Sequence, residues 1–244
     1  MNKVYALALR TLKEIIRDPL TIVFGLGLPV ILIIFLSAIQ MNVPVEIFMP
    51  GELVPGMVVF GQSFFTLFAA MIVSKDRETA FLERLYTTPL KSIHFILGYM
   101  LPILPLALIQ ALACYLTGLC FKLEPTIGIL YGALGSLPIS IFFISIGLLF
   151  GSILNAKAVG GICGALMTNL TAFLSGIWFD LELVGEGFMV FAKCLPFVHA
   201  VEIERMLYSL EFSNPLLPIL ILAGYTIASV VISILLFLRQ MKRR

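Results

Sequence analysis

Charged side chains are scarce in this sequence. Asp, Glu, Lys and Arg make up 12% of the 244 residues, whereas 60% are hydrophobic, and the mean hydropathy is +1.08. A chain of this composition has too few polar groups to cover a globular surface, which excludes an ordinary soluble domain. Because a bilayer requires every backbone polar group to be bonded within the protein, the composition predicts an all-α integral membrane protein.

Motifs for catalysis and for energy conversion are also missing. The sequence contains no G-x-x-x-x-G-K-[ST] for ATP and no H-E-x-x-H for zinc, and its four cysteines lack metal-ligand spacing. Its apolar runs lack the Asp, Glu, Lys or Arg on which an ion-coupled transporter normally depends. We therefore expect no catalytic residue, no metal and no cofactor in this chain. Any transport would need energy from another protein.

What the sequence does contain is six apolar stretches. Each is about 20 residues or longer, the length that crosses the hydrocarbon core of a bilayer. We predict six transmembrane helices at about 20–39, 54–73, 93–121, 127–153, 158–179 and 216–238.

The basic residues are segregated between the loops. Thirteen of the sixteen Lys and Arg fall on one side of the predicted spans: Lys3, Arg10, Lys13, Arg17, Lys75, Arg77, Arg84, Lys91, Lys157, Arg239, Lys242, Arg243 and Arg244. Cytoplasmic loops carry the excess of Lys and Arg in membrane proteins. Both termini are therefore predicted to be cytoplasmic, in agreement with an even number of spans.

Two segments outside the spans have helical patterns of their own. Residues 1–19 alternate apolar and charged faces at helical spacing, which predicts an interfacial helix that ends in an elbow at Pro19. A solvated N-terminal helix is the alternative. Residues 180–215 contain apolar runs too short to cross, which favours a pair of short re-entrant helices on the outer side, or else a surface loop with one amphipathic helix.

Polar side chains within the spans are candidates for a substrate pathway or a dimer interface. Thr168, Thr171 and Ser175 share one helical face, and their hydroxyls either line a pathway or bond back to the helix. Phe65 lies beside a second polar group, where it offers aromatic surface to a substrate or packs in the core. The candidates are Gln62, Ser63, Phe65, Thr66, Thr168, Asn169, Thr171 and Ser175.

A charged stretch, SKDRETAFLERLYTTPL, separates the second and third spans. It covers residues 74–90 on the predicted cytoplasmic side, and its end is marked by Pro89, since the residue before proline avoids helical conformation. We predict a short helix over 75–88 in which Phe81 and Leu85 lie one turn apart among charged residues. Such a helix suits docking into a cleft of another protein. An ordinary solvated loop is the alternative.

This stretch resembles the cytoplasmic coupling segment of ABC-2 type transporter permeases. The matching residues are Asp76, Arg77, Glu78, Leu82, Glu83, Leu85, Thr88 and Pro89, with Ala80-Phe81 in place of the usual small and hydroxyl pair. Arg17-Asp18-Pro19 resembles the family's elbow motif, and Leu174-Ser175-Gly176 resembles the end of its fifth span. Pro196, Glu202 and Arg205 resemble its outer segment.

The resemblance implies a permease that dimerises with a second copy or a homologue. Each copy would dock one of two soluble ABC ATPase subunits, which bind ATP and Mg, and the complex would export small amphipathic molecules such as drugs, peptides or lipids. It implies a prokaryotic plasma or inner membrane, lipid as a further partner and no nucleic acid. The implied ATPase-coupling residues are Asp76, Arg77, Glu78, Phe81, Glu83, Arg84, Leu85, Asn155 and Lys157.

Two alternatives remain open from the sequence. One is a permease for a polysaccharide or a lipid-linked glycan on the same scaffold, which a wide, aromatic-lined tunnel would favour. The chain has a single tryptophan, Trp178, and no aromatic-rich N-terminal segment, so small amphipathic substrates are preferred. The other is a membrane immunity or peptide-binding protein that transports nothing and needs no ATPase.

Overall fold

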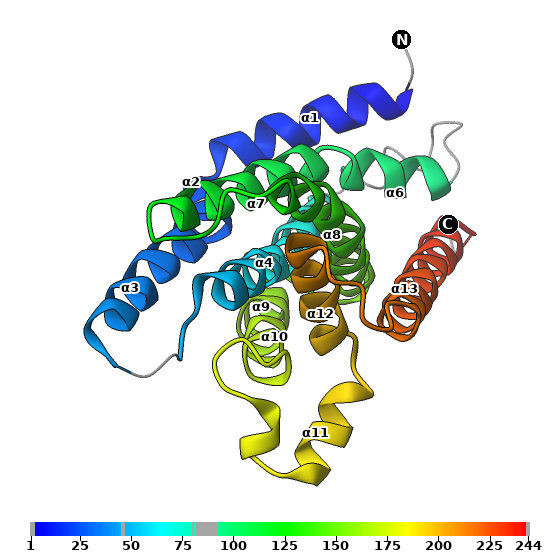
Figure 1. The fold of residues 1–244 in the computed structure, drawn as a ribbon. Coiled ribbons are helices and arrows are strands. Elements are labelled where there is room, and N and C mark those ends of the chain that lie inside the picture. The colour runs from blue at the N-terminus through cyan, green and yellow to red at the C-terminus, as the bar shows by residue number, and fades with distance from the viewer. Residues whose placement is uncertain (1–2, 45–46, 80, 82–91, 243–244) are drawn as a thin grey trace.

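The computed structural model describes residues 3–44, 47–79, 81 and 92–242, and the secondary structure of this part of the chain consists of helices joined by turns and loops, without strands. Figure 1 shows the arrangement. In chain order the elements are α1 (Lys3–Arg17), α2 (Pro19–Ile22), η1 (Val23–Gly27), α3 (Leu28–Asn42), α4 (Pro50–Glu78), α6 (Ser92–Met100), α7 (Ile103–Leu119), α8 (Gly128–Ile153), α9 (Ala156–Val159), η2 (Gly160–Leu166), α10 (Met167–Leu174), η3 (Leu181–Leu183), α11 (Glu186–Lys193), α12 (Pro196–Ser209) and α13 (Leu216–Lys242).

The prediction of six membrane-spanning helices is confirmed. Six helical segments are long and apolar enough to cross a bilayer: Val23–Asn42, Pro50–Glu78, Ser92–Leu119, Gly128–Ile153, Ala156–Leu174 and Leu216–Arg239. The largest differences from the predicted bounds lie at two ends. The second span continues to Glu78 instead of ending near residue 73, and the fifth ends at Leu174 because Gly176 adopts a φ of +71°, a conformation that terminates helices.

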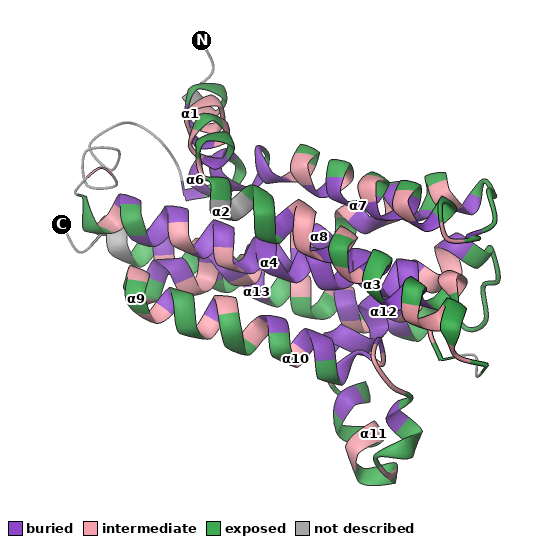
Figure 2. Ribbon diagram, turned by 90° about the vertical axis from the view of Figure 1, so that its left-hand side faces the viewer, coloured by how far each residue is buried: buried purple, intermediate pink, exposed green. Residues whose placement is uncertain are grey.

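Helix α4 is the centre of the bundle. It contacts α3, α7, α8, α10 and α12, and nearly all of its apolar residues are buried within this single chain. In Figure 2, α4 is buried along most of its length, whereas α1 crosses one end of the bundle. The last turns of α13 also lie at that end, which we call the terminal end, and the loops before α4 and α8 lie at the opposite end. Because α4 contacts so many other helices, we expect a displacement of its last turn to shift most of the bundle.

Close packing of α4 on α8 depends on two glycines. A methyl group at Gly147 would lie 2.4 Å from the carbonyl oxygen of Thr66, and one at Gly151 would lie 2.6 Å from that of Ala70. Both obstructing atoms belong to the backbone of α4, so no side-chain rotation relieves the overlap. The spacing of four residues therefore brings two helix backbones into contact.

We predict that Gly147→Ala separates these helices and lowers the free energy of unfolding by about 1–3 kcal/mol, the range found for overpacked cores. The matched control is Gly224→Ala in α13, where an added methyl group meets nothing within 4 Å. Thermal unfolding in detergent should show a lower midpoint for the first variant alone. Equal midpoints for the two variants would contradict the close contact.

Helix α1 lies against α6 across the terminal end. Leu7 and Ile15 are buried, while Tyr5 and Ile16 are exposed apolar side chains on the same helix. The helix ends at Arg17, and Pro19 begins α2, as expected for a chain that changes direction at a proline. Its position in the membrane interface stays a prediction.

The segment from 180 to 215 folds into η3, α11 and α12. Helix α12 is the better buried of the two α-helices and packs against α4, α8 and α13 through side chains such as Phe197 and Val201. It ends at Ser209, and the following residue, Leu210, has a left-handed φ of +62°. Two short helices are thus present, and their re-entry into the outer leaflet stays a prediction.

Candidate functional site

Asp76 lies in the last turn of α4 and joins three helices. Its side chain is almost completely buried, with 2% exposure. The Arg10 guanidinium of α1 donates to both carboxylate oxygens, with Nη2 2.6 Å from Oδ1, and the Tyr99 hydroxyl of α6 donates to Oδ2 over 2.8 Å. A bidentate arginine and a tyrosine hydroxyl satisfy a buried carboxylate well. Asp76 therefore fastens both α1 and α6 to the central helix.

Arg77, the next residue, caps the end of α8. Its guanidinium donates to the backbone carbonyls of Ser152 and Ile153 and, over 2.6 Å, to that of Leu154. The last carbonyls of a helix have no partner within the helix and carry partial negative charge. A cation placed there completes the hydrogen bonding of α8 and ties it to α4.

Glu78 caps the beginning of α9, as Arg77 caps the end of α8. Its carboxylate accepts a hydrogen bond from the backbone N–H of Ala156 over 2.9 Å, at the positive end of the next helix. The side chain of Asn155 accepts from the N–H of Ala158 over 2.8 Å and caps the same helix. Lys157 is exposed beside them.

These three residues form one contact point, which we call the clamp: Asp76, Arg77 and Glu78. It joins the last turn of α4 to α1, α6, α8 and α9, all at the terminal end. Burial raises the pKa of Glu14. The Arg10 guanidinium, 3.0 Å away, lowers that pKa by a smaller amount. Burial lowers the pKa of Arg10, but its bonds to Asp76 outweigh this effect and leave the pKa raised.

The structure changes one part of the predicted coupling helix over 75–88. Asp76, Arg77 and Glu78 belong to the end of the second span and face other helices of the chain, rather than lying on a separate helix. Thr79 is the C-cap of α4, so the helix ends only after these residues. Phe81 lies beneath Arg10, whose guanidinium carbon is 4.3 Å from the ring centroid. Glu83, Arg84 and Leu85 lie outside the described residues.

The polar candidates of the second span are all inside the chain. Gln62, Ser63, Phe65 and Thr66 are buried. The Ser63 hydroxyl donates to the carbonyl of Phe60 over 2.6 Å, and that of Thr66 donates across to Phe143 on α8 over 3.0 Å. Within the described residues, the Gln62 amide has no hydrogen-bond partner. Within a single chain, these four residues therefore contribute to helix packing and do not border an open surface.

The candidates of the fifth span divide between two faces. Thr168, Thr171 and Ser175 are buried, and the first two hydroxyls bond back to their own helix, that of Thr171 to Met167 over 2.9 Å. Asn169 lies on the exposed face, with its amide 2.8 Å from the carbonyl of Ala165. The shared Thr and Ser face thus turns toward the chain itself, and a different face of the helix is left exposed.

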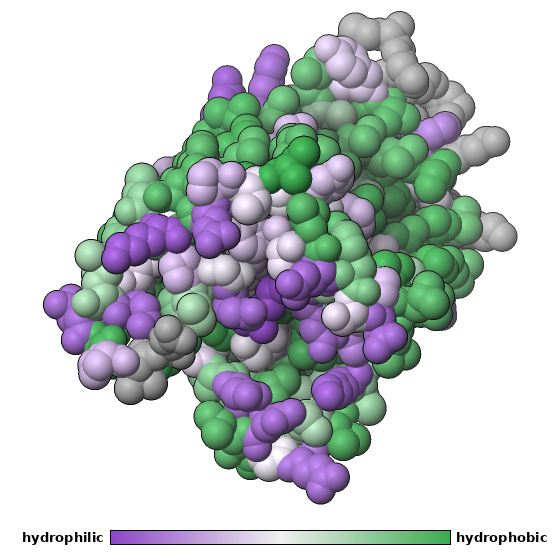
Figure 3. Space-filling view, in the orientation of Figure 1, coloured by the Kyte–Doolittle hydropathy of each residue, from purple (hydrophilic) through white to green (hydrophobic). Residues whose placement is uncertain are grey.

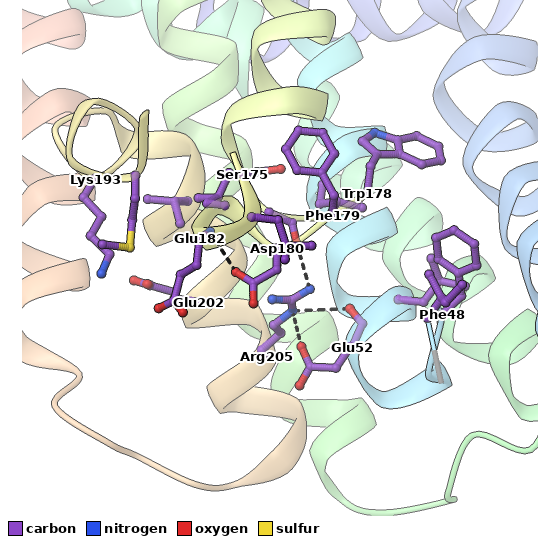
Figure 4. A pocket seen from close by; sticks show the side chains of 18 residues that line it. Phe48, Glu52, Ser175, Trp178, Phe179, Asp180, Glu182, Lys193, Glu202 and Arg205 are labelled. Atoms are coloured by element: carbon purple, nitrogen blue, oxygen red, sulfur yellow. Dashed lines mark hydrogen bonds and ion pairs between the residues drawn. The ribbon is translucent and has the colours of Figure 1, made fainter. Parts of the chain in front are cut away.

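A cavity of about 730 Å³ lies at the opposite end, where α4 begins and α10 ends. Figure 4 shows its side chains, among them Ser175 and Arg205. Arg205 of α12 lies 2.8 Å from the Glu52 carboxylate and donates to the carbonyl of Gly176 over 3.3 Å. Burial lowers the pKa of Arg205 against the opposing charge of Glu52. Arg205 therefore links three elements around the cavity.

His199 has acceptors at both ring nitrogens. Nδ1 lies 3.0 Å from the Glu202 carboxylate, and Nε2 lies 2.8 Å from the carbonyl of Lys193. Since neither partner can donate when Glu202 is ionised, both nitrogens must carry hydrogen, which makes the ring an imidazolium. The hydrogen bond with Glu202 raises the pKa of His199 against the effect of burial.

Glu204 is the most deeply buried acid of α12, with 0% exposure. The Tyr115 hydroxyl of α7 donates to Oε1 over 2.8 Å, while Oε2 has no partner among the described residues. Burial raises the pKa of Glu204 to about 8, so the side chain is protonated at neutral pH. A neutral carboxylic acid thus lies between α7, α8 and α12.

Sequence reasoning missed four of these partners: Arg10, Tyr99, Tyr115 and Glu204. Arg10 was visible as a charge on the polar face of α1, but nothing in the pattern indicated that it reaches the end of α4. Glu204 carried a weak signal, as an acid whose neighbours one helical turn away, Ala200, Val201, Leu207 and Tyr208, are apolar or aromatic. The two tyrosines carried no signal, because the pattern of an apolar span does not show where a hydroxyl points.

The chain matches the family model for ABC-2 type transporters over residues 2–208, which include α1, the clamp, the cavity and nearly all of α12. No curated protein matches the chain.

Proposed function

The chain belongs to the ABC-2 type transporter family and is a membrane-spanning permease subunit of an ABC transporter; from this premise we propose that it exports small amphipathic molecules. The energy comes from ATP hydrolysed by a separate soluble subunit, two copies of which bind ATP and Mg. Each permease copy docks one ATPase through the segment that follows α4. A second copy or a homologue completes the complex in the plasma or inner membrane.

The observation that carries this proposal is the clamp. The predicted docking segment begins where α4 ends, and the last turn of α4 is bonded to α1, α6, α8 and α9. A push on that segment therefore moves the ends of five helices together. Because α4 is also buried among the other spans, the displacement reaches the opposite end of the bundle. This is how ATPase closure would switch the spans between inward-open and outward-open forms.

The distribution of charge supports a cytoplasmic location for the clamp. Arg10 and Arg17 belong to α1, which crosses the terminal end of the bundle, and Arg77, Lys157 and Arg239 belong to the ends of α4, α9 and α13 that lie there. Excess positive charge favours the cytoplasmic side. The docking surface then consists of the residues that the family resemblance indicates, with Phe81 and Leu85 in the ATPase cleft, Glu83 and Arg84 in charged contacts, and Asn155 and Lys157 in a smaller contact.

The fifth span supplies the surface for the second permease copy. Its exposed face contains Leu166, Asn169 and Phe173, in contrast to the buried Thr168 and Thr171. An amide between apolar residues at helical spacing can bond across to its counterpart in a partner helix. We therefore assign this face, in place of the Thr and Ser face, to the dimer interface.

Affinity purification of the tagged chain from gently solubilised native membranes tests the ATPase partnership. We predict that a soluble ATP-hydrolysing subunit co-purifies and is lost with Glu83→Lys combined with Arg84→Glu. The control, Lys122→Glu with Glu211→Lys, reverses the same charges at exposed positions of the opposite end. If no ATPase accompanied intact, dimeric protein, or if the first variant exported normally, the docking proposal would fail and a non-transporting peptide-binding protein would be favoured.

A further inference from the structure

The cavity at the opposite end has an aromatic wall. Phe48 precedes α4, while Trp178 and Phe179 follow α10, and all three border the cavity together with aliphatic side chains from η3. The volume of about 730 Å³ lies within the usual range for sites that hold a drug-sized molecule. Aromatic walls bind flat apolar groups and also attract cations through their ring faces.

Carboxylates outnumber cations around this cavity. Its lining includes four acids, Glu52, Asp180, Glu182 and Glu202, and two bases, Lys193 and Arg205. Two of the acids are already compensated, since Glu52 pairs with Arg205 and Glu202 pairs with the His199 ring. Within the described part of the chain, Asp180 and Glu182 take part in no ion pair, although the charge of Asp180 also acts on Arg205. The site is left with excess negative charge next to its aromatic wall.

Ser175 provides an independent indication of a ligand. Its side chain is only 1% exposed, lines the cavity, and has no hydrogen-bond partner for its hydroxyl among the described residues. An unpartnered buried hydroxyl lowers stability, so such groups are uncommon unless something else satisfies them. The other hydroxyls of the same helix, those of Thr168 and Thr171, are bonded to its backbone. Of these three hydroxyls, that of Ser175 is the one without a partner among the described residues.

We propose that this cavity binds an amphipathic organic cation. The aromatic body of the ligand packs against Phe48, Trp178 and Phe179, and an ammonium group lies toward Asp180 and the Ser175 hydroxyl, to which it donates a hydrogen bond. Figure 3, which looks along the bundle, shows hydrophilic residues gathered on the face where α11 and α12 lie. The inference deepens the proposed function, on which it rests, by naming the substrate class.

Trp178 makes the binding directly measurable. It is the only tryptophan of the chain and borders the cavity, so energy transfer from its indole reports a ligand at this place. The probe is aminomethylanthracene, a flat aromatic ammonium whose anthracene ring accepts energy from tryptophan. Anthracenemethanol and anthracene carboxylate have nearly the same shape and are neutral and anionic. With purified protein in detergent we expect saturable transfer from the ammonium probe and at least about ten-fold weaker binding of the other two.

Two variants test the assigned groups. Asp180→Asn removes one charge but keeps the oxygen that accepts from the N–H of Glu182, and it should weaken ammonium binding about ten-fold. Ser175→Ala should weaken it about five-fold while raising the thermal midpoint of the empty protein, because it deletes an unpartnered buried hydroxyl. A purely structural role for Ser175 would instead lower the midpoint. The control Glu186→Gln removes an equal charge from an exposed position that does not line the cavity, and should bind normally.

Equal binding of the alcohol or the carboxylate would overturn the proposal, and so would equal weakening by Glu186→Gln, which would indicate a diffuse surface charge. The assay contains no ATP and no ATPase, so it is independent of the coupling proposal. Failure to bind the cation with a normal co-purifying ATPase would leave the exporter proposal intact. Binding without a co-purifying ATPase would leave a cation-binding membrane protein.

Discussion

Replacing Asp76 with alanine is expected to reduce ATP-driven transport at least about ten-fold while leaving membrane insertion intact. The change removes the carboxylate that Arg10 and Tyr99 share, and so detaches α1 and α6 from the end of α4. Loss of one partner from a fully buried ion pair costs about 3–5 kcal/mol. Because the Arg10 side chain is 37% exposed and can turn to water, we expect a smaller loss of folding stability, about 2 kcal/mol.

The measurement is substrate uptake into inverted vesicles that contain the permease and its ATPase, together with ATP hydrolysis by the same vesicles. Without the clamp, the vesicles should still hydrolyse ATP while transport falls. The reason is that the ATPase still docks but no longer moves the helices as one unit. Lys75→Ala is the control, because it removes a charge from the exposed neighbouring position. Transport by Asp76→Ala at the level of this control would show that the clamp carries no coupling.

A double-mutant cycle separates the clamp from general destabilisation. Arg10→Ala alone should damage transport, and Arg10→Ala with Asp76→Ala should be little worse than either single variant, because both remove one interaction. Arg10→Lys retains the charge but cannot make both hydrogen bonds, so it should give an intermediate rate. Additive losses would instead indicate two independent effects on stability.

The spans were predictable because each depends only on the hydropathy of its own residues. Pro50–Glu78 and Leu216–Arg239 are apolar enough to be recognised without any tertiary information. The end of α4 was placed too early, because the charges of Asp76 to Glu78 were read as the start of a solvated segment. In the folded chain their charges are compensated by other helices, which lets the span continue for another turn.

The partners of those charges could not be predicted for a physical reason. Periodicity shows which side of a helix a residue occupies but not which helix lies opposite, and Arg10 contacts a residue 66 positions away. The same limit applies to Thr168 and Thr171, whose shared face was evident from spacing. Packing decides whether that face contacts lipid, a second copy of the permease or other helices of the same chain. Here it contacts other helices of the same chain.

Glu204→Gln is expected to stabilise the protein at alkaline pH. Burial raises the pKa of Glu204 in the folded chain to about 8 from an ordinary value of 4.5, so the folded state favours the protonated acid. Its stabilising contribution is complete below pH 4.5 and is lost as the pH rises toward 8. Since one pKa unit corresponds to about 1.4 kcal/mol, raising the pH from 5 to 8 should cost the wild-type chain roughly 4 kcal/mol from this residue at most. The glutamine remains neutral and still offers an oxygen to Tyr115, so it avoids this cost.

Thermal unfolding followed by the fluorescence of Trp178 measures this difference between pH 5 and pH 8. The two proteins should have similar midpoints at pH 5, and the variant should unfold at a distinctly higher temperature at pH 8. His199 adds a slope of the same sign, because its raised pKa also favours the protonated form, but it is present in both proteins and cancels in the comparison. Glu211→Gln, an exposed acid just beyond the same helix, is the control and should follow the wild type at both pH values. A pH-independent difference between Glu204→Gln and the wild type would mean that Glu204 is ionised in the folded protein, held by a cation that the packing of α7, α8 and α12 does not supply.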